Sequence, residues 1–259
     1  MGWGAGLIDG DRNHLIVFFS GAQPLRKSFH FLDYAERFPQ TKLFIRDDSP
    51  NQFRTGIPGV TENEEENVAF FRYLIGRIAP SRVTFVTGSV GTHPAILWGH
   101  RLGVDDIHAV VPVTDLDSGL QTQRAASGTF AEHARVAGQA VASGYPYANL
   151  RPFMESNSGK VKSVDLYYGL SDPADVQQAA NIEDLPQVRS TIYYHGTHNR
   201  VPLMVMRRDR ELYDRINAPH IERPAELRRK GDVQDVELGY GVCRVVKRDA
   251  KLTPTPVGV

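Results

Sequence analysis

The sequence predicts an α/β protein in which helices cover both faces of one mostly parallel sheet. Short apolar runs alternate with helical patterns along most of the chain, as expected of strands joined by crossover helices. The runs at residues 15–19 and 107–113 are almost continuously apolar, which is typical of strands buried on both faces. With 259 residues, 41% of them hydrophobic, the chain can bury one substantial core and needs no second one.

Each element follows from the local pattern in its turn. Apolar runs bounded by polar or glycine-containing turns predict strands at 15–19, 42–45, 83–86, 107–113, 164–168 and 190–194. Helices are expected at 28–38, at 64–78, after the strand at 83–86, and near 132–142. The helix at 64–78 opens on three glutamates, whose carboxylates complement the helix dipole, so this acidic run indicates a helix start and not a metal site.

The most informative stretch passes from a strand to a helix through a glycine–serine turn. A serine on such a sharp turn stands clear of the sheet, and the helix N-terminus beside it offers free backbone N–H groups to an oxyanion. The stretch fits the Gly-x-Ser-x-Gly pattern at Gly88, Ser89 and Gly91, but Thr87 stands at the first glycine position and crowds the bend. Ser89 is therefore the candidate nucleophile, and an ordinary strand-to-helix turn is the alternative. A phosphate-binding loop is weaker, since neither Gly-x-Gly-x-x-Gly nor a P-loop pattern occurs.

Two later strands end in the residue types that would complete a catalytic triad. Asp172 and Asp175 follow the strand at 164–168, and two histidines follow the strand at 190–194. We favour Asp172 as the acid, because it lies in a Gly-x-x-Asp-Pro loop. Asp175 either caps a helix that starts near Val176 or is itself the acid.

The histidines likewise offer one favoured candidate for the base and one alternative. His198 is the candidate base, and His195 is its rival, although His195 sits closer to the strand end. We expect His93, inside the helix after the serine, to be a packed or pocket-wall residue. Serine, acid and histidine, each just past the end of its own strand, follow one another in the order known for nucleophile-elbow hydrolases.

On these residues the chain resembles the α/β-hydrolase superfamily. Within it, the chain is similar to a small bacterial branch of O-acetyltransferase-like and esterase-like proteins linked to surface-glycan assembly and accessory secretion. The resemblance covers residues 14–217 and rests on the serine turn, the loop at Gly169 and the loop at Gly196. It implies an α/β-hydrolase fold and a triad, and it does not choose a substrate.

The expected roles follow from the chemistry of acyl transfer. Ser89 attacks an ester-like carbonyl, His198 takes its proton, and an aspartate fixes the imidazole tautomer. The backbone N–H of Val90 and a second N–H from the loop after the first strand would hold the oxyanion. In that loop Gly21 permits the bend, and Ala22 or Gln23 supplies the donor.

Composition narrows the partners without naming one. The 30 basic and 30 acidic residues give zero formal net charge, which argues against nucleic acid and anionic membranes and for a small or uncharged acyl or ester substrate. No apolar stretch predicts a membrane span, and the first residues lack a secretory leader pattern. The single cysteine, Cys243, excludes an intramolecular disulfide, so we expect a cytoplasmic protein. The nine histidines show no metal-ligand spacing, and we expect no metal and no cofactor.

The chain divides into a core at 1–220 and an appendage at 221–259. Within the core the interval 114–160 is longer than one crossover helix requires, so we expect it to form a cap that decides specificity; a pair of surface helices is the alternative. Strand-like runs at 233–238 and 242–247 predict a hairpin, which could mediate a homodimer or cover a sheet edge.

Two functions of different class remain from sequence alone. The first is a serine hydrolase or acyltransferase acting on an ester, thioester or acyl group. The second is a catalytically inactive protein of the same fold, used for binding or as a scaffold. Thr87 and the unsettled acid favour the second, whereas the intact serine, the histidine and their order favour the first.

Overall fold

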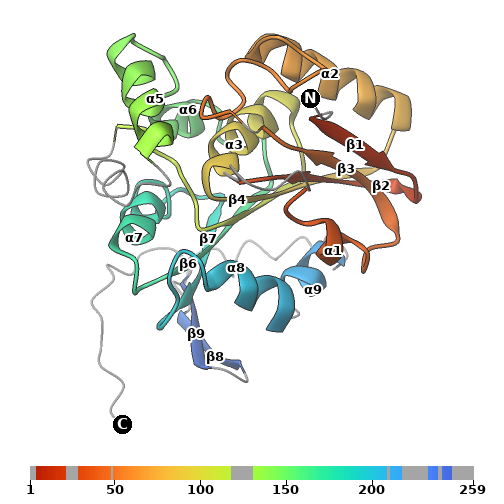
Figure 1. Cartoon of the computed structure of the whole chain (residues 1–259). Helices are drawn as coiled ribbons and strands as arrows, with labels where there is room; N and C mark the ends of the chain where they lie inside the picture. Colours follow the sequence, from red (N-terminus) through yellow and green to blue (C-terminus); the bar gives the residue numbers. More distant parts are fainter. Residues whose placement is uncertain are drawn as a thin grey trace.

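A single twisted sheet runs through the molecule (Figure 1). The computed structural model describes residues 4–21, 29–47, 49–117, 131–208, 211–217, 233–238 and 241–246. Within them the sheet has the strand order β1-β3-β2-β4-β5-β6-β7-β9-β8. Its strands are β1 (Ala5–Ile8), β2 (Asp11–Phe19), β3 (Gln40–Ile45), β4 (Arg82–Gly88), β5 (Asp106–Val110), β6 (Ser163–Gly169), β7 (Val188–Tyr193), β8 (Val233–Leu238) and β9 (Gly241–Val246). Strands β2 to β7 pair in parallel, which confirms the predicted mostly parallel sheet.

Helices cover both faces of this sheet, as predicted. In Figure 1, α2 and α3 lie over one face, and α1, α8 and α9 lie over the other. The helices are α1 (Leu32–Ala35), α2 (Glu64–Ile78), α3 (Thr92–Leu102), α5 (Ala131–Ala142), α6 (Leu150–Ser156), α7 (Pro173–Ala180), α8 (Val201–Leu203) and α9 (Glu211–Asn217). A short 3₁₀ turn, η1 (Ser89–Gly91), precedes α3, and a π-helix, η2 (Met204–Arg208), follows α8. Among the described helices, none combines the length and apolar composition needed to cross a bilayer.

The alternation of side chains along each buried strand builds two hydrophobic cores. Leu15, Val17 and Phe19 of β2 point into the core under α2 and α3, while Ile16 and Phe18 point into the core under α1, α8 and α9. All five are at most 1% exposed. Burial on both faces is the physical reason why this strand is apolar at consecutive positions.

Most predicted elements are present, with differences that have local causes. The helix at 64–78 has the predicted bounds, and the side chain of Asn63 caps it by accepting the N–H of Glu66. The helix predicted at 28–38 is described only as Leu32–Ala35, and residues 22–28 lie outside the described residues. The strand predicted at 107–113 ends at Val110, because Val111 turns the chain with a φ of 48°.

Antiparallel pairs flank the parallel strands at both edges of the sheet. The predicted hairpin is present as β8 and β9, and β9 also pairs antiparallel with β7, so the hairpin covers that edge of the parallel strands. At the other edge, β1 pairs antiparallel with β3; its four residues gave no strand signal of their own.

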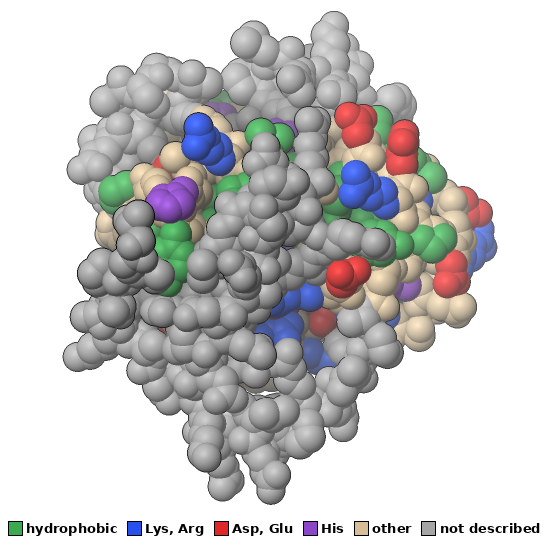
Figure 2. All heavy atoms as spheres, turned by 90° about the horizontal axis from the view of Figure 1, so that it is seen from below, with side chains coloured by type: hydrophobic (Ala, Val, Ile, Leu, Met, Phe, Trp, Pro, Cys, Tyr) green, Lys and Arg blue, Asp and Glu red, His purple; other side chains and the backbone are tan. Residues whose placement is uncertain are grey.

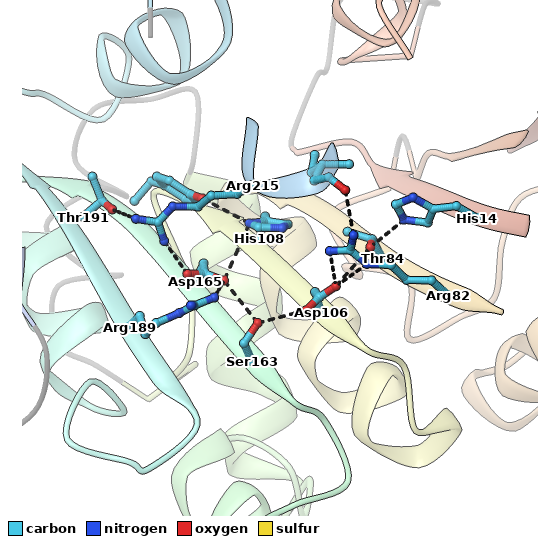
Figure 3. A network of polar contacts seen from close by, with 12 residues as sticks. His14, Arg82, Thr84, Asp106, His108, Ser163, Asp165, Arg189, Thr191 and Arg215 are labelled. Carbon is cyan, nitrogen blue, oxygen red and sulfur yellow. Dashed lines mark hydrogen bonds and ion pairs between the residues drawn. The ribbon is translucent and has the colours of Figure 1, made fainter. Parts of the chain in front are cut away.

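A network of charged and polar residues lies at the amino ends of the parallel strands (Figure 3). The carboxylate of Asp106, on β5, accepts hydrogen bonds from Arg82, on β4, at 2.7 and 2.9 Å. The carboxylate of Asp165, on β6, accepts from Arg189 at 2.6 Å and from Arg215, on α9, at 2.5 Å. These pairs tie α9 to the sheet. On the face seen in Figure 2, basic and acidic side chains likewise lie close to one another.

Candidate active site

The strand β4 turns into α3 through a strained serine at the carboxyl edge of the sheet. Ser89 has a φ of 52°, a left-handed conformation that is uncommon outside glycine, and it is half-buried. The short η1 turn follows it and passes directly into α3. The predicted sharp strand-to-helix turn is therefore present, and backbone strain of this kind is concentrated at functional sites.

Close backbone packing explains how this turn tolerates Thr87. A Cβ placed on Gly91 would lie 2.9 Å from Oγ1 of Thr87 and 2.8 Å from the carbonyl oxygen of Ser20. The threonine side chain thus occupies space that the second glycine of the pattern leaves open. Thr87 is fully buried, and its hydroxyl has no hydrogen-bond partner in the described part of the chain.

One hydrogen-bonded chain joins Ser89 to a buried carboxylate through His198. Nε2 of His198 lies 3.1 Å from Oγ of Ser89, and Nδ1 of the same ring lies 2.8 Å from Oδ1 of Asp175. Asp175 is fully buried, whereas the His198 side chain is 15% exposed. The ring therefore contacts an acid with one nitrogen and a hydroxyl with the other, which is the arrangement of a nucleophile, base and orienting acid.

The structure places Asp175, and not the favoured Asp172, against His198. Oδ1 of Asp172 accepts the backbone N–H groups of Ala174 at 3.0 Å and Asp175 at 3.3 Å, so Asp172 is the N-cap of α7. The helix begins at Pro173, three residues before the predicted start near Val176. Asp175 consequently sits in the first turn of α7, where its side chain reaches His198.

Two glycines bring the loops that carry Asp175 and His198 together. A Cβ on Gly169, at the end of β6, would overlap the carbonyl oxygen of Gly196, which follows β7. The N–H of Ser171 donates to that same carbonyl at 3.1 Å. Only a glycine at position 169 permits this approach, so the loop signals in the sequence have a direct steric origin.

The other two candidate histidines, His93 and His195, are not part of the hydrogen-bonded chain from Ser89 to Asp175. His93 is 2% exposed, and its Nε2 lies 2.8 Å from the carbonyl oxygen of Tyr147. Burial lowers its pKa to about 4, so the ring is neutral near neutral pH. His93 is thus a packed residue, as expected, and His195 is exposed.

The loop after β2 lies against the serine turn. A Cβ on Gly21 would lie 2.9 Å from the carbonyl oxygen of Gly88 and 3.3 Å from Cβ of Ser89. The N–H of Gly21 donates to Nδ1 of His30 at 2.9 Å, so the structure uses this N–H to hold the loop. Ala22 and Gln23, the expected second oxyanion donors, lie outside the described residues.

Val90, whose N–H is the first expected donor, is buried directly after Ser89. It packs against Val113, Leu116 and Ala137, and so joins the serine turn to the segment predicted as a cap.

A pocket of about 380 Å³ opens beside Ser89 and His198. Its other described lining residues come from three places: the chain around α1, the ends of β4 and β5, and the segment from 199 to 206. They are His30, Phe31, Asp33, Tyr34, Arg37, Gly88, Val110, Val111, Asn199, Pro202, Leu203 and Met206. No described residue of the interval 114–160 lines this pocket.

The sequence prediction missed these walls, because it looked for specificity in the interval 114–160. The apolar run at 201–206, directly after His198, was the available signal.

The chain offers no separate metal centre among its described residues. Asp172, Asp175 and His198 form a group whose ligand atoms lie within 4.8 Å of one another. Each of them already makes a contact described above: Asp172 caps α7, and Asp175 is bonded to His198. The helix cap and the hydrogen-bonded chain account for these atoms, and we assign no metal to them.

Comparison with known proteins identifies the fold. No protein-family model matches this chain, and no curated protein sequence matches it. Among solved structures, the capsule O-acetyltransferase of Neisseria meningitidis serogroup A is similar with a TM-score of 0.60 and 15% identity, over 83% of this chain and 92% of that one. A variant of that enzyme in complex with CoA is similar with a TM-score of 0.56 and 16% identity, over 82% and 91%.

Two further structures share the architecture. The Glycosylation Associate Protein (Gap123) complex from Streptococcus agalactiae has a TM-score of 0.58 and 14% identity, over 81% of this chain and 43% of that one. An α/β hydrolase from a Medee basin deep-sea metagenome library, MGS-M2, has a TM-score of 0.55 and 9% identity, over 85% and 95%. At these identities the likeness establishes the α/β-hydrolase fold and nothing finer.

Proposed function

Because the chain has the α/β-hydrolase fold, we propose that it is a serine enzyme that transfers or hydrolyses an acyl group held as an ester or thioester. The observation that carries the proposal is the hydrogen-bonded chain from Asp175 through His198 to Ser89, with distances of 2.8 and 3.1 Å. Its members follow three different strands, β4, β6 and β7, at the carboxyl ends of those strands. An inactive scaffold has no need to keep this geometry.

The geometry supports a two-step reaction through an acyl-enzyme. Nε2 of His198 accepts the proton of Ser89 as Oγ attacks the carbonyl carbon. Asp175 accepts the Nδ1–H of His198, which fixes the tautomer and stabilises the imidazolium. We assign the N–H of Val90, within η1, as one donor to the developing oxyanion. His198 then protonates the leaving group, and the acyl group stays on Ser89 until water or an alcohol accepts it.

Hydrolysis and transfer differ only in which acceptor reaches the acyl-enzyme. The likeness to an O-acetyltransferase, one structure of which holds CoA, makes a thioester donor and an alcohol acceptor worth testing beside simple esters. The likeness to MGS-M2 gives equal reason to test hydrolysis.

The decisive experiment is labelling with a fluorophosphonate probe, followed by mass spectrometry of the adduct. We expect the wild-type protein to carry the label on Ser89, and the Ser89→Ala and His198→Ala variants to carry none. A folded wild-type protein that stays unlabelled would overturn the proposal in favour of a binding or scaffold role. Parallel assays with an acyl thioester, with and without an added alcohol, then separate hydrolysis from transfer.

A further inference from the structure

The pocket beside Ser89 has a buried apolar inner end and a polar, exposed outer end. Phe31, Val110 and Val111 are at most 3% exposed and line the pocket together with Gly88. The charged lining residues Asp33 and Arg37 are exposed, as is Asn199. The polarity of the pocket thus changes with depth, and its buried lining, apolar apart from Tyr34, suits a mainly apolar group.

The floor of the pocket is held by strained backbone. Val111 has a φ of 48°, which is a genuine outlier for a β-branched residue, and its N–H donates to the carbonyl oxygen of Tyr167 at 2.7 Å. The strained conformation ends β5 where Val110 pairs with Gly88 of β4, and both residues line the pocket next to Ser89. Strain of this kind persists only where the surrounding structure enforces it, and it is concentrated at ligand sites.

The wall of the pocket formed by α8 and η2 is fixed by buried residues and lined by partly exposed ones. Val201 and Val205 are fully buried in the core under α8 and α9, and they hold the wall against the sheet. Between and after them, Pro202, Leu203 and Met206 line the pocket. Met206 lies in the π-helix η2, a rare conformation that often occurs at functional sites, and methionine adapts its shape to apolar ligands. Leu203 is 47% exposed at this wall, so a large apolar side chain stands open to the solvent there.

The size of the pocket exceeds what an acetyl group fills. A volume of 380 Å³ lies within the range of about 300 to 1,000 Å³ that is typical of pockets for drug-sized ligands. The acyl group is the part of the substrate that stays on Ser89 between the two steps, whereas the leaving group and the acceptor must enter and leave through solvent. The buried apolar end of the pocket therefore suits the acyl chain better than the alcohol or thiol.

We propose that the pocket between α1 and the α8–η2 segment binds the acyl chain of the substrate, and that this chain is apolar and of medium length. The inference rests on the proposed serine chemistry and extends it to a substrate class. It assigns acyl selectivity to Leu203 and Met206, and it moves that role away from the interval 114–160.

The test varies the two halves of the substrate separately. In the first series, p-nitrophenyl acetate, butyrate, hexanoate and octanoate share one leaving group. We expect kcat/KM to rise at least about tenfold from the acetate to the best longer ester, because each buried methylene is worth a severalfold gain. In the second series, acetate esters of alcohols of increasing length share one acyl group, and we expect changes below about threefold.

Two substitutions in the pocket wall test where the acyl chain of the substrate binds. Leu203→Trp and Met206→Trp fill the pocket, so we expect each to lower kcat/KM for the octanoate at least about tenfold while the acetate ester changes by less than about threefold. Leu7→Trp is the matched control: Leu7 is 52% exposed on β1, at the far edge of the sheet, and both esters should keep their wild-type rates.

Each adverse outcome has a distinct meaning. Rates that depend on alcohol length but not on acyl length would place the leaving group in the pocket and would overturn the inference. If Ser89 were still labelled by the probe, the proposed serine chemistry would stand. A wild-type protein that neither reacts with the probe nor cleaves any ester would instead overturn the proposed function.

A binding assay tests the pocket assignment even if the wild-type protein neither reacts with the probe nor cleaves any ester. Calorimetry with acetate, butyrate, hexanoate and octanoate on folded Ser89→Ala needs no turnover. We expect affinity to rise with chain length and Leu203→Trp to abolish the rise; equal affinities for all four acids would contradict the pocket assignment.

Discussion

Asp175, not Asp172, places a carboxylate oxygen 2.8 Å from Nδ1 of His198. The two acids are three residues apart, yet one lies in the first turn of α7 and the other caps that helix from outside. Both residues are aspartates, so the same replacement, asparagine, can be made at each position. This makes the assignment of the triad acid unusually open to experiment.

The first prediction is that Asp175→Asn abolishes most activity and Asp172→Asn does not. An asparagine at 175 cannot stabilise the imidazolium, and it favours the wrong tautomer, so we expect kcat to fall by about 10³- to 10⁴-fold. An asparagine at 172 caps a helix about as well as aspartate does, so activity should stay within about tenfold. Steady-state rates on the best ester measure both. Equal losses in the two variants would contradict the assignment.

The second prediction concerns the contact between the loops after β6 and β7. Gly169→Ala drives a methyl group into the carbonyl of Gly196, so the loops that hold Asp175 and His198 must separate. A misplacement of about 1 Å costs on the order of a hundredfold in rate, which is the loss in kcat we expect.

Gly76→Ala is the matched control for that substitution. Gly76 lies in α2, and a Cβ there meets no atom within 4 Å. We expect the helix to gain about 0.5 to 1 kcal/mol of stability and the rate to stay unchanged. A Gly169→Ala protein with wild-type kcat would show that the close approach is dispensable.

The sequence predicted the parallel sheet well because strands that are buried on both faces are apolar at consecutive positions. Residues 15–19 carry no polar side chain, and no pattern other than a fully buried strand fits so short a run between polar segments. The helix at 64–78 was equally clear, since its carboxylates and its length both indicate helix.

Hydrophobic periodicity did not decide between the two nearby aspartates. Either Asp172 or Asp175 can cap a helix, and the outcome depends on where the helix starts, to within one turn. Pro173 was the usable signal, because proline is favoured at the first position of a helix and so indicates Asp172 as the cap. Helix boundaries are set by such local competition, which hydrophobic periodicity does not report.

The pocket walls were missed for a different reason. Phe31 and Met206 lie far apart in the chain, and only the tertiary fold brings their segments to the pocket that Ser89 lines. The polar network was missed in the same way: Asp165 and Arg215 are 50 residues apart and stand in segments that otherwise look apolar or solvated.

The third prediction is that Arg215 anchors α9 through Asp165. Burial by itself raises the pKa of the Asp165 carboxyl, but the guanidinium groups of Arg189 and Arg215 outweigh burial and hold that pKa well below its usual range. Asp165 is 1% exposed, so Arg215→Met leaves a buried carboxylate with half of its compensation. We expect the free energy of unfolding, measured in urea, to fall by about 2 kcal/mol.

Arg135→Met is the control for this anchor. Arg135 pairs with Glu132 on α5, but both side chains are more than half exposed, so the loss should stay below about 0.5 kcal/mol. The double variant Arg215→Met with Asp165→Asn should recover part of the stability, because it removes the buried charge together with its partner. No recovery would mean that Arg215 acts by packing alone.

The fourth prediction is that the protein loses stability on mild acidification because it buries neutral histidines. Burial lowers the pKa of His14, His93 and His108 from 6.5 to about 4. Between these two values the unfolded chain binds protons at these sites and the folded chain does not, so unfolding takes up protons. Stability is therefore complete above about pH 6.5 and falls as the pH drops towards about 4, by up to about 1.4 kcal/mol per pH unit for each histidine.

Urea unfolding at several pH values between about 7.5 and about 4.5 measures this slope. His108 is the most informative site, because Asp165, Arg189 and Arg215 surround it and its Nδ1 lies 3.1 Å from the hydroxyl of Tyr167. In His108→Gln we expect the number of protons taken up on unfolding to fall by about one. If His108→Gln kept the wild-type slope, His108 would already be protonated in the folded protein, and the neutral-core account of the pH dependence would be wrong.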